Sequence, residues 1–178
     1  IRICGSALIL IIALAVLISY LTVRRRNVLN ACIDTLSMVP YIIPGAVVGI
    51  SLILAFNNPV LPLVGTATIM IVSMCIRRIP YTIRSSVAIL AQIPLSIDEA
   101  AESLGAGKVK TLLKVTLPMM FSGVFAGAVM SWVTLITELS SSLLLYSFRT
   151  QTLNVAVYKA VGNGTDGRAC ALATIVTV

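Results

Sequence analysis

The sequence predicts an all-α protein, a polytopic bundle of transmembrane helices. Of its 178 residues, 58% are hydrophobic and only 11% are charged, whereas soluble domains carry about 25% charged residues. The mean hydropathy is +1.05. The apolar residues gather in runs of about 20, which at ~1.5 Å per residue cross a hydrocarbon core of ~30 Å. A soluble fold of this length could not bury so much apolar surface, so we expect lipid to form part of the solvent.

The first two spans are expected at residues 3–23 and 35–56. A block of three arginines at 24–26 ends the first span and marks a cytoplasmic face. Prolines and glycines interrupt the second span, and a membrane bundle tolerates them where neighbouring helices satisfy the backbone. Small residues also allow close helix contact. The interrupting residues are Pro40, Pro44, Gly45 and Gly49.

Three further spans are expected at 63–83, 118–145 and 169–178. The 63–83 span ends in arginines that suit the inner interface, and the 118–145 span is free of charge until Glu138, near its far end. Residues 150–161 favour a short interfacial helix. Because the chain opens on Ile1 inside one apolar run and stops inside another, we expect a piece of a longer protein, cut within its fifth span.

Charge asymmetry supports this arrangement. The net charge is +7, and membrane proteins gather Lys and Arg in cytoplasmic loops. Aromatic residues do not alternate with the basic ones as base stacking would require, so no nucleic acid is expected. Four basic residues fall on the expected outer side: Arg2, Arg149, Lys159 and Arg168. Nine fall on the inner side: Arg24, Arg25, Arg26, Arg77, Arg78, Arg84, Lys108, Lys110 and Lys114.

The polar interval 85–117 is the most informative segment. Ser96 and Glu99 have the S-x-x-E spacing of a capping box, which predicts a helix start. Gly105 is suited to the left-handed conformation that ends a helix. A second amphipathic piece follows over 108–117, and Pro118 is placed to begin the next span. A short helix, a glycine hinge and a second helix on the inner face could dock on a soluble partner, or could be an inert connection.

The same segment resembles the EAA loop of binding-protein-dependent ABC importer permeases, the MetI-like family. That family's pattern reads E-A-A, three residues, G, nine residues, I-x-L-P. The matching residues here are Glu99, Ala100, Ala101, Gly105, Leu117 and Pro118, and the one departure is Val115 in place of isoleucine.

The resemblance implies a type I importer permease with a cytoplasmic EAA coupling loop at 85–117 that contacts an ABC ATPase subunit. Glu99, Ala100 and Gly105 would lie at that contact. Further implied partners are a periplasmic or lipid-anchored substrate-binding protein, the lipid bilayer of the bacterial inner membrane, and a second permease domain. That second domain could be a homodimer partner or another half of the same chain.

ATP would bind to the partner subunit, because G-x-x-x-x-G-K-[ST] is absent from this chain. No cofactor, resident metal or catalytic residue is expected, since the sequence has no histidine and its four cysteines form no C-x-x-C pair.

Several stretches resemble the ferric iron permeases of this family, which shade into permeases for phosphonates, sugar phosphates and polyamines. Glu138 is the one acidic residue within an expected span, and intramembrane acids are functional candidates. Fe³⁺ favours oxygen ligands, so Glu138 and Ser141 are candidates for the substrate path. The alternative is an ordinary solvated or helix-pairing carboxylate near the outer interface.

Two other classes compete with an ABC permease. A secondary transporter or channel would need ion-coupling residues inside its spans, and only Glu138 is available. An intramembrane enzyme would need a histidine or a pair of intramembrane aspartates, and the expected spans contain neither. Both alternatives are therefore weaker than the permease.

Overall fold

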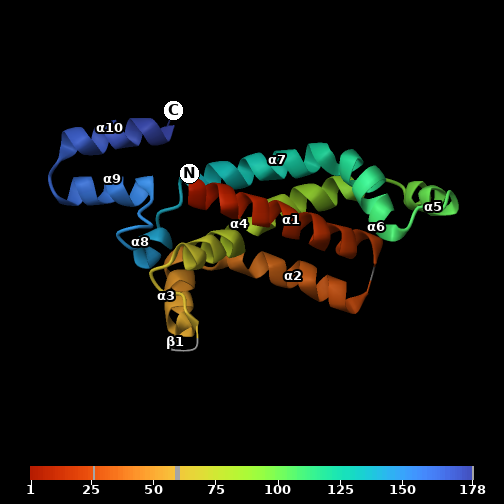
Figure 1. The fold of residues 1–178 in the computed structure, drawn as a ribbon, viewed down its shortest axis with the longest axis horizontal. Helices are drawn as coiled ribbons and strands as arrows, with labels where there is room; N and C mark the ends of the chain where they lie inside the picture. The colour runs from red at the N-terminus through yellow and green to blue at the C-terminus, as the bar shows by residue number, and fades with distance from the viewer. Residues whose placement is uncertain (26, 59–60, 178) are drawn as a thin grey trace. The chain divides into compact units, whose positions relative to one another are not determined.

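The computed structural model describes residues 1–25, 27–58 and 61–177, and helices dominate it (Figure 1). Strands β1 (Asn57–Asn58) and β2 (Leu61–Pro62) pair antiparallel, with Asn57 opposite Pro62. The all-α prediction is confirmed. The helices are α1 (Arg2–Arg24), α2 (Val28–Ile42), α3 (Gly45–Phe56), α4 (Ala67–Leu90), α5 (Leu95–Ser103), α6 (Lys108–Thr111), the π-helix η1 (Leu112–Thr116), α7 (Leu117–Ile136), α8 (Ser142–Leu145), α9 (Leu153–Gly162) and α10 (Asp166–Thr177).

Only some of these helices match a straight transmembrane span. Within the described residues, α1 and the continuous helix 108–136 are long and apolar enough to cross a bilayer, and α2 with α3 could supply a third, broken span. Helix α4 has 24 residues, which is sufficient length, but three arginines interrupt its apolar surface. The five-span scheme therefore remains a prediction.

The segment 35–56, expected as one span interrupted by prolines and glycines, is divided between two helices. Helix α2 ends at Ile42, and α3 begins at Gly45 after Pro44 in an extended conformation with φ −57° and ψ 139°. Pro44 has no N–H to donate, and its ring disfavours a helical residue before it. Pro40, in contrast, stays inside α2.

The segment 118–145 is also broken. Helix α7 ends at Ile136, residues 137–141 leave the helix, and α8 resumes at Ser142. The expected interfacial helix at 150–161 is α9, which begins after Thr152, whose side chain accepts a hydrogen bond from the Val155 N–H. The break places Glu138 on irregular backbone rather than on a helix.

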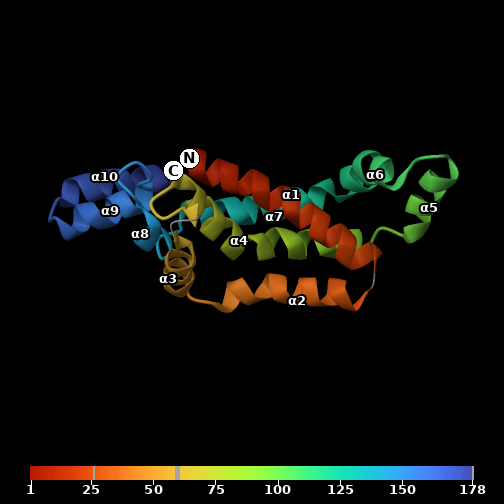
Figure 2. The ribbon, with the colours of Figure 1, turned by 60° about the horizontal axis from the view of Figure 1, so that its bottom comes forward.

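The chain folds into two compact units. Unit 1 contains residues 1–7, 40–77 and 132–178, and unit 2 contains residues 8–39 and 78–131. In unit 1, α9 and α10 lie side by side (Figures 1 and 2), and α3 contacts α8.

In unit 2, α1, α4 and α7 lie side by side (Figures 1 and 2). Two glycines of α7 allow its close approach to α4. A Cβ at Gly127 would lie 2.7 Å from Thr82 Cα, and one at Gly123 would lie 2.9 Å from the Ser85 carbonyl oxygen. The Ser85 hydroxyl donates to the Gly123 carbonyl at 2.7 Å. Small residues at such an interface let two backbones meet, as membrane helices require.

Candidate functional site

The predicted hinge in the 85–117 loop is present. Helix α5 ends at Ser103, and Gly105 follows with φ +84°. The Gly105 N–H donates to the Glu102 carbonyl at 2.9 Å, and the Ala106 N–H donates to the Ala101 carbonyl at 3.1 Å. This pair of bonds is the Schellman motif, in which glycine adopts the left-handed conformation without steric cost. The role of Gly105 in ending the helix is confirmed.

The start of α5 differs from the prediction. The helix begins at Leu95 after Pro94, with no side-chain capping bond, so Ser96 and Glu99 form no capping box. The fixed φ of Pro94 already sets the entry into the helix. Pro118 lies in the first turn of α7, as expected, but no break precedes that helix. A π-helix over 112–116 carries the chain directly into α7, and its wider turn accommodates the proline's missing N–H.

One face of α5 is open to solvent or a partner. Glu99, Ala100 and Gly105 are exposed, and Leu104 is 90% exposed. Ala101 is half-buried. An apolar side chain so fully exposed beside a hinge is available for contact with another surface.

The other two residues of the motif lie at the start of α7. Leu117 is half-buried and Pro118 is exposed. They therefore lie beyond the π-helix rather than on α5, and the structure separates the motif between two helices.

The opposite face of α5 carries a buried ion pair. Asp98 is 5% exposed, and its Oδ2 lies 2.7 Å from Nε of Arg24, the last residue of α1. The N–H is not aligned as a hydrogen bond, so the contact is ionic. Arg24 Nη1 donates to the Ile93 carbonyl at 2.9 Å, and the Thr116 hydroxyl donates to Asp98 Oδ1 at 2.8 Å.

Sequence reasoning missed this pair. Arg24 belongs to the arginine block that marks a cytoplasmic face, and Asp98 lies 74 residues further along the chain. An available clue was the position of Asp98, directly after the apolar Ile97 and three residues before Ala101, which is the inward face of the helix. A pocket of about 220 Å³ lies beside the pair, lined by Tyr20, Arg24, Arg25, Leu95, Asp98, Glu99, Glu102 and Lys108.

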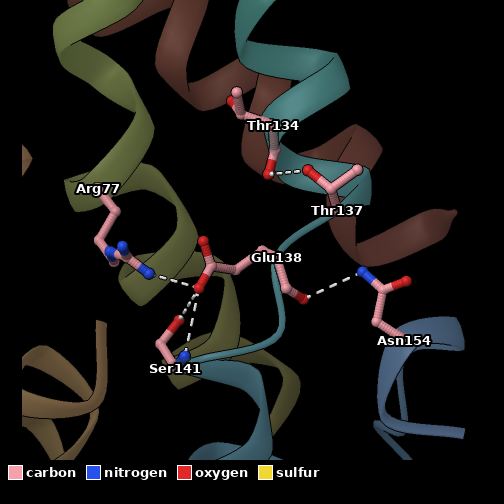
Figure 3. A network of polar contacts seen from close by, with 6 residues as sticks. All are labelled: Arg77, Thr134, Thr137, Glu138, Ser141 and Asn154. Carbon is pink, nitrogen blue, oxygen red and sulfur yellow. Dashed lines mark hydrogen bonds and ion pairs between the residues drawn. The ribbon is translucent and has the colours of Figure 1, made fainter. Parts of the chain in front are cut away.

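A second buried ion pair lies in unit 1 (Figure 3). Arg77 donates from Nη1 to Oε1 of Glu138, a residue that is 3% exposed. The same oxygen accepts from the Ser141 N–H at 3.2 Å and from the Ser141 hydroxyl at 3.3 Å. The structure therefore brings both substrate-path candidates together. The Arg77 guanidinium also gives the buried Glu138 carboxylate a counter-charge.

Two helix breaks meet at this pair. Gly45, the first residue of α3, lies against Arg77, because a Cβ at Gly45 would come within 2.1 Å of Arg77 Nη1. The same Cβ would lie 2.9 Å from Ser140 Cβ, in the break after α7. Irregular backbone at membrane depth occurs where it is buried in protein or lines a cavity, and broken helices mark transporter binding sites.

Asn154 of α9 supports the break after α7. Its Nδ2 donates to the Ile136 carbonyl at 2.6 Å and to the Glu138 carbonyl at 3.4 Å, which satisfies carbonyls left without partners at a helix end. A pocket of about 340 Å³ adjoins it, lined by Thr137, Leu139, Asn154, Val157, Tyr158 and Val161. The carbonyls of the broken segment are thus held in a fixed conformation.

Across residues 1–25, 27–58 and 61–177, no group of three or more Cys, Asp or Glu could hold a metal ion. Cys4 and Cys75 are buried, Cys32 and Cys170 are exposed, and all four are free thiols.

Comparisons with known proteins match nearly the whole chain. The family model described as "Binding-protein-dependent transport system inner membrane component" matches residues 5–178. The ferric transport system permease protein FbpB of Actinobacillus pleuropneumoniae is 32% identical over 174 residues, which are 98% of this chain and 25% of that protein. The molybdate/tungstate transport system permease protein WtpB of Thermococcus kodakarensis is 27% identical over 146 residues, which are 82% of this chain and 58% of that protein.

A solved structure shares the fold. The MetNI methionine ABC transporter in its inward-facing conformations superimposes with a TM-score of 0.79 at 16% identity, over 99% of this chain and 83% of the matched chain. The chain spans about a quarter of the FbpB relative and little more than half of the WtpB relative. Because the family model covers all but the first four residues and the MetI-like fold is shared, the chain belongs to the family of binding-protein-dependent transport system inner membrane components.

Proposed function

We propose that this chain forms the membrane-spanning part of an ABC importer, which moves its cargo by alternating access driven by a partner ATPase. The observation that carries the proposal is the exposed face of α5. Glu99 and Ala100 are exposed there, and the Schellman turn at Gly105 fixes the direction in which the chain leaves the helix. A short rigid helix with an exposed apolar tip at Leu104 is suited to a groove on a soluble subunit.

The movement would begin at the ATPase. ATP-driven closure of its subunits would displace α5, and the attached helices would tilt so that the cargo site opens to alternate sides of the membrane. A substrate-binding protein would deliver the cargo from outside. A second permease domain would complete the path, as a second copy or as another part of a longer chain.

Ferric iron is the proposed cargo. The FbpB relative is a ferric transport permease, and the break after α7 places the Glu138 carboxylate beside the Ser141 hydroxyl, two oxygen donors of the kind that Fe³⁺ favours. Arg77 is the present counter-ion of Glu138. A cation on this path would therefore compete with Arg77 for the carboxylate. An oxyanion, the cargo named for the WtpB relative, would instead compete with Glu138 for the guanidinium.

Copurification and uptake test the proposal. The full-length protein should copurify with an ABC ATPase, and changing Glu99→Gln or Gly105→Val should abolish uptake of ferric iron while the protein still inserts. Uptake that survives ATP depletion but collapses with the ion gradient would instead identify a secondary transporter. Normal transport by both variants would refute the assignment of α5 as the coupling helix.

A separate transport experiment with two cargoes tests whether the cargo is ferric iron. Liposomes containing the assembled transporter are supplied with binding protein loaded with ferric iron or with molybdate. ATP-dependent accumulation of iron alone is expected. Accumulation of molybdate alone would overturn the iron proposal and leave the importer proposal standing.

A further inference from the structure

We propose that the contact among Arg24, Asp98 and Thr116 is the joint through which movement of α5 reaches α1 and α7. This inference rests on the proposed function. Arg24 ends α1, Asp98 lies in the first turn of α5, and Thr116 ends the π-helix that continues into α7. One polar cluster therefore connects the short helix to α1 and, through the π-helix, to α7, with distances of 2.7 Å and 2.8 Å to the two oxygens of Asp98.

The geometry favours a joint because α5 has few other means of attachment. It has nine residues, its outer face is exposed, and its chain continues through a glycine hinge. Its inward face consists of Asp98 and of Ile97, which packs against the buried cluster of Leu90, Ile93, Met120 and Val124. Apolar contacts are non-directional and can slide. The hydrogen bond from Thr116 to Asp98 instead depends on direction, and the ionic contact at 2.7 Å holds Asp98 at the end of α1.

Arg24 also connects α5 to the end of α4. Its side chain is 7% exposed and its Nη1 donates to the carbonyl of Ile93, in the turn that leads out of α4. A displacement of Asp98 would therefore pull on the end of α1 and on the Ile93 turn together.

The cluster also has room and spare bonding capacity to rearrange. Within the described chain, Arg24 Nη2 and Asp98 Oδ2 are buried without a hydrogen-bond partner, and the pocket of about 220 Å³ opens beside them. The Thr116 hydroxyl lies 3.4 Å from the Thr111 carbonyl as well as 2.8 Å from Asp98. It can exchange one acceptor for the other as α5 moves, so a shift need not leave a buried hydroxyl unsatisfied.

Variants of the full-length transporter, assembled with its ATPase and binding protein in liposomes, test the joint. Assembly is measured as ATPase copurifying with the permease. Coupling is measured as the increase in ATP hydrolysis caused by the loaded binding protein, supplied with ferric iron and, in a parallel arm, with molybdate. The single change Asp98→Asn should lower assembly, because it leaves Arg24 buried without a counter-charge.

The double change Arg24→Met with Asp98→Leu should restore assembly to within twofold of the unaltered protein, because the buried charges are replaced together. The increase in ATP hydrolysis should nevertheless fall at least tenfold. A merely structural pair would recover both readouts. The control Arg168→Met, at an exposed arginine of α10 outside the cluster, should change neither readout. Thr116→Val removes the hydrogen bond to Asp98 without changing any charge, and it should lower coupling about threefold.

Coupling within twofold of the unaltered protein in both the double variant and Thr116→Val would overturn the joint. If instead the unaltered protein assembles with no ATPase at all, the proposed function fails, and the joint fails with it. If Glu99→Gln uncouples the complex while the double variant and Thr116→Val do not, the joint alone is wrong.

Discussion

Replacing Gly45 with alanine tests whether the ion pair in unit 1 depends on the glycine at the start of α3. The new Cβ would lie 2.1 Å from Arg77 Nη1, 2.7 Å from Arg77 Cζ and 2.9 Å from Ser140 Cβ. Carbon atoms in contact are separated by about 3.5–4.0 Å. The guanidinium must therefore move by roughly 1.5 Å, which lifts Nη1 away from Glu138.

The cost follows from what that movement breaks. Removing one partner of a buried ion pair costs about 3–5 kcal/mol, and overfilling a packed site costs about 1–3 kcal/mol. Arg77 is flexible and half-buried, whereas Glu138 is 3% exposed and retains Ser141. We therefore expect Gly45→Ala to lower the free energy of unfolding by about 3 kcal/mol, the value at which the two ranges meet. For a chain of this size that corresponds to a fall in melting temperature of roughly 6–12 °C.

The assay is thermal unfolding of the detergent-solubilised, full-length protein, with Gly5→Ala as the matched control. Gly5 lies in α1, and a Cβ there would meet nothing within 4 Å, so alanine should be neutral or stabilise by up to about 1 kcal/mol. In an Arg77→Met, Glu138→Leu background, the cost of Gly45→Ala should fall to about 1 kcal/mol. Equal melting temperatures for Gly45→Ala and Gly5→Ala would refute the reasoning.

Three other substitutions give distinct outcomes. Gly127→Ala should destabilise by about 1–3 kcal/mol in the same unfolding assay, because the Cβ meets backbone, Thr82 Cα at 2.7 Å, and backbone cannot rotate away. Gly105→Ala should destabilise by about 1–2 kcal/mol, because alanine disfavours the φ of +84°; an added Cβ would meet nothing within 4 Å. Asn tolerates this conformation better, so Gly105→Asn should increase the protease sensitivity of the loop less than Gly105→Ala does. Asn154→Ala should cost about 1–3 kcal/mol and accelerate amide exchange at residues 137–141, because the Ile136 carbonyl loses its donor at 2.6 Å.

The parts of the fold that sequence predicts are those set by local chemistry. The apolar runs of α1 and α7 and the glycine that ends α5 are local signals, and each is confirmed. The break at Pro44 is also a local signal, since a proline before a glycine ends a helix, but the apolar run around it obscured the break. Membrane helices tolerate some prolines, as α2 does Pro40, so a proline in an apolar run does not by itself predict where a span breaks.

The two buried ion pairs could not be predicted in this way. Arg24 and Asp98 are 74 residues apart in the chain, and Arg77 and Glu138 are 61 apart. No periodicity connects residues at such separations, because helical spacing predicts neighbours only three or four positions away. Sequence indicated that Glu138 was unusual. Only the fold shows that Arg77 neutralises it and that Gly45 makes room for the pairing.

The ion pairs also bear on which face of the membrane the 85–117 loop occupies. Three of the basic residues on the expected inner side form ion pairs that reduce their free charge: Arg24 with Asp98, Arg77 with Glu138 and Arg84 with Asp34. Setting these three aside leaves six, still more than the four on the outer side. Acidic residues contribute little to the orientation signal in any case. The predicted sidedness, on which the proposed coupling role of α5 depends, therefore does not rest on these three arginines.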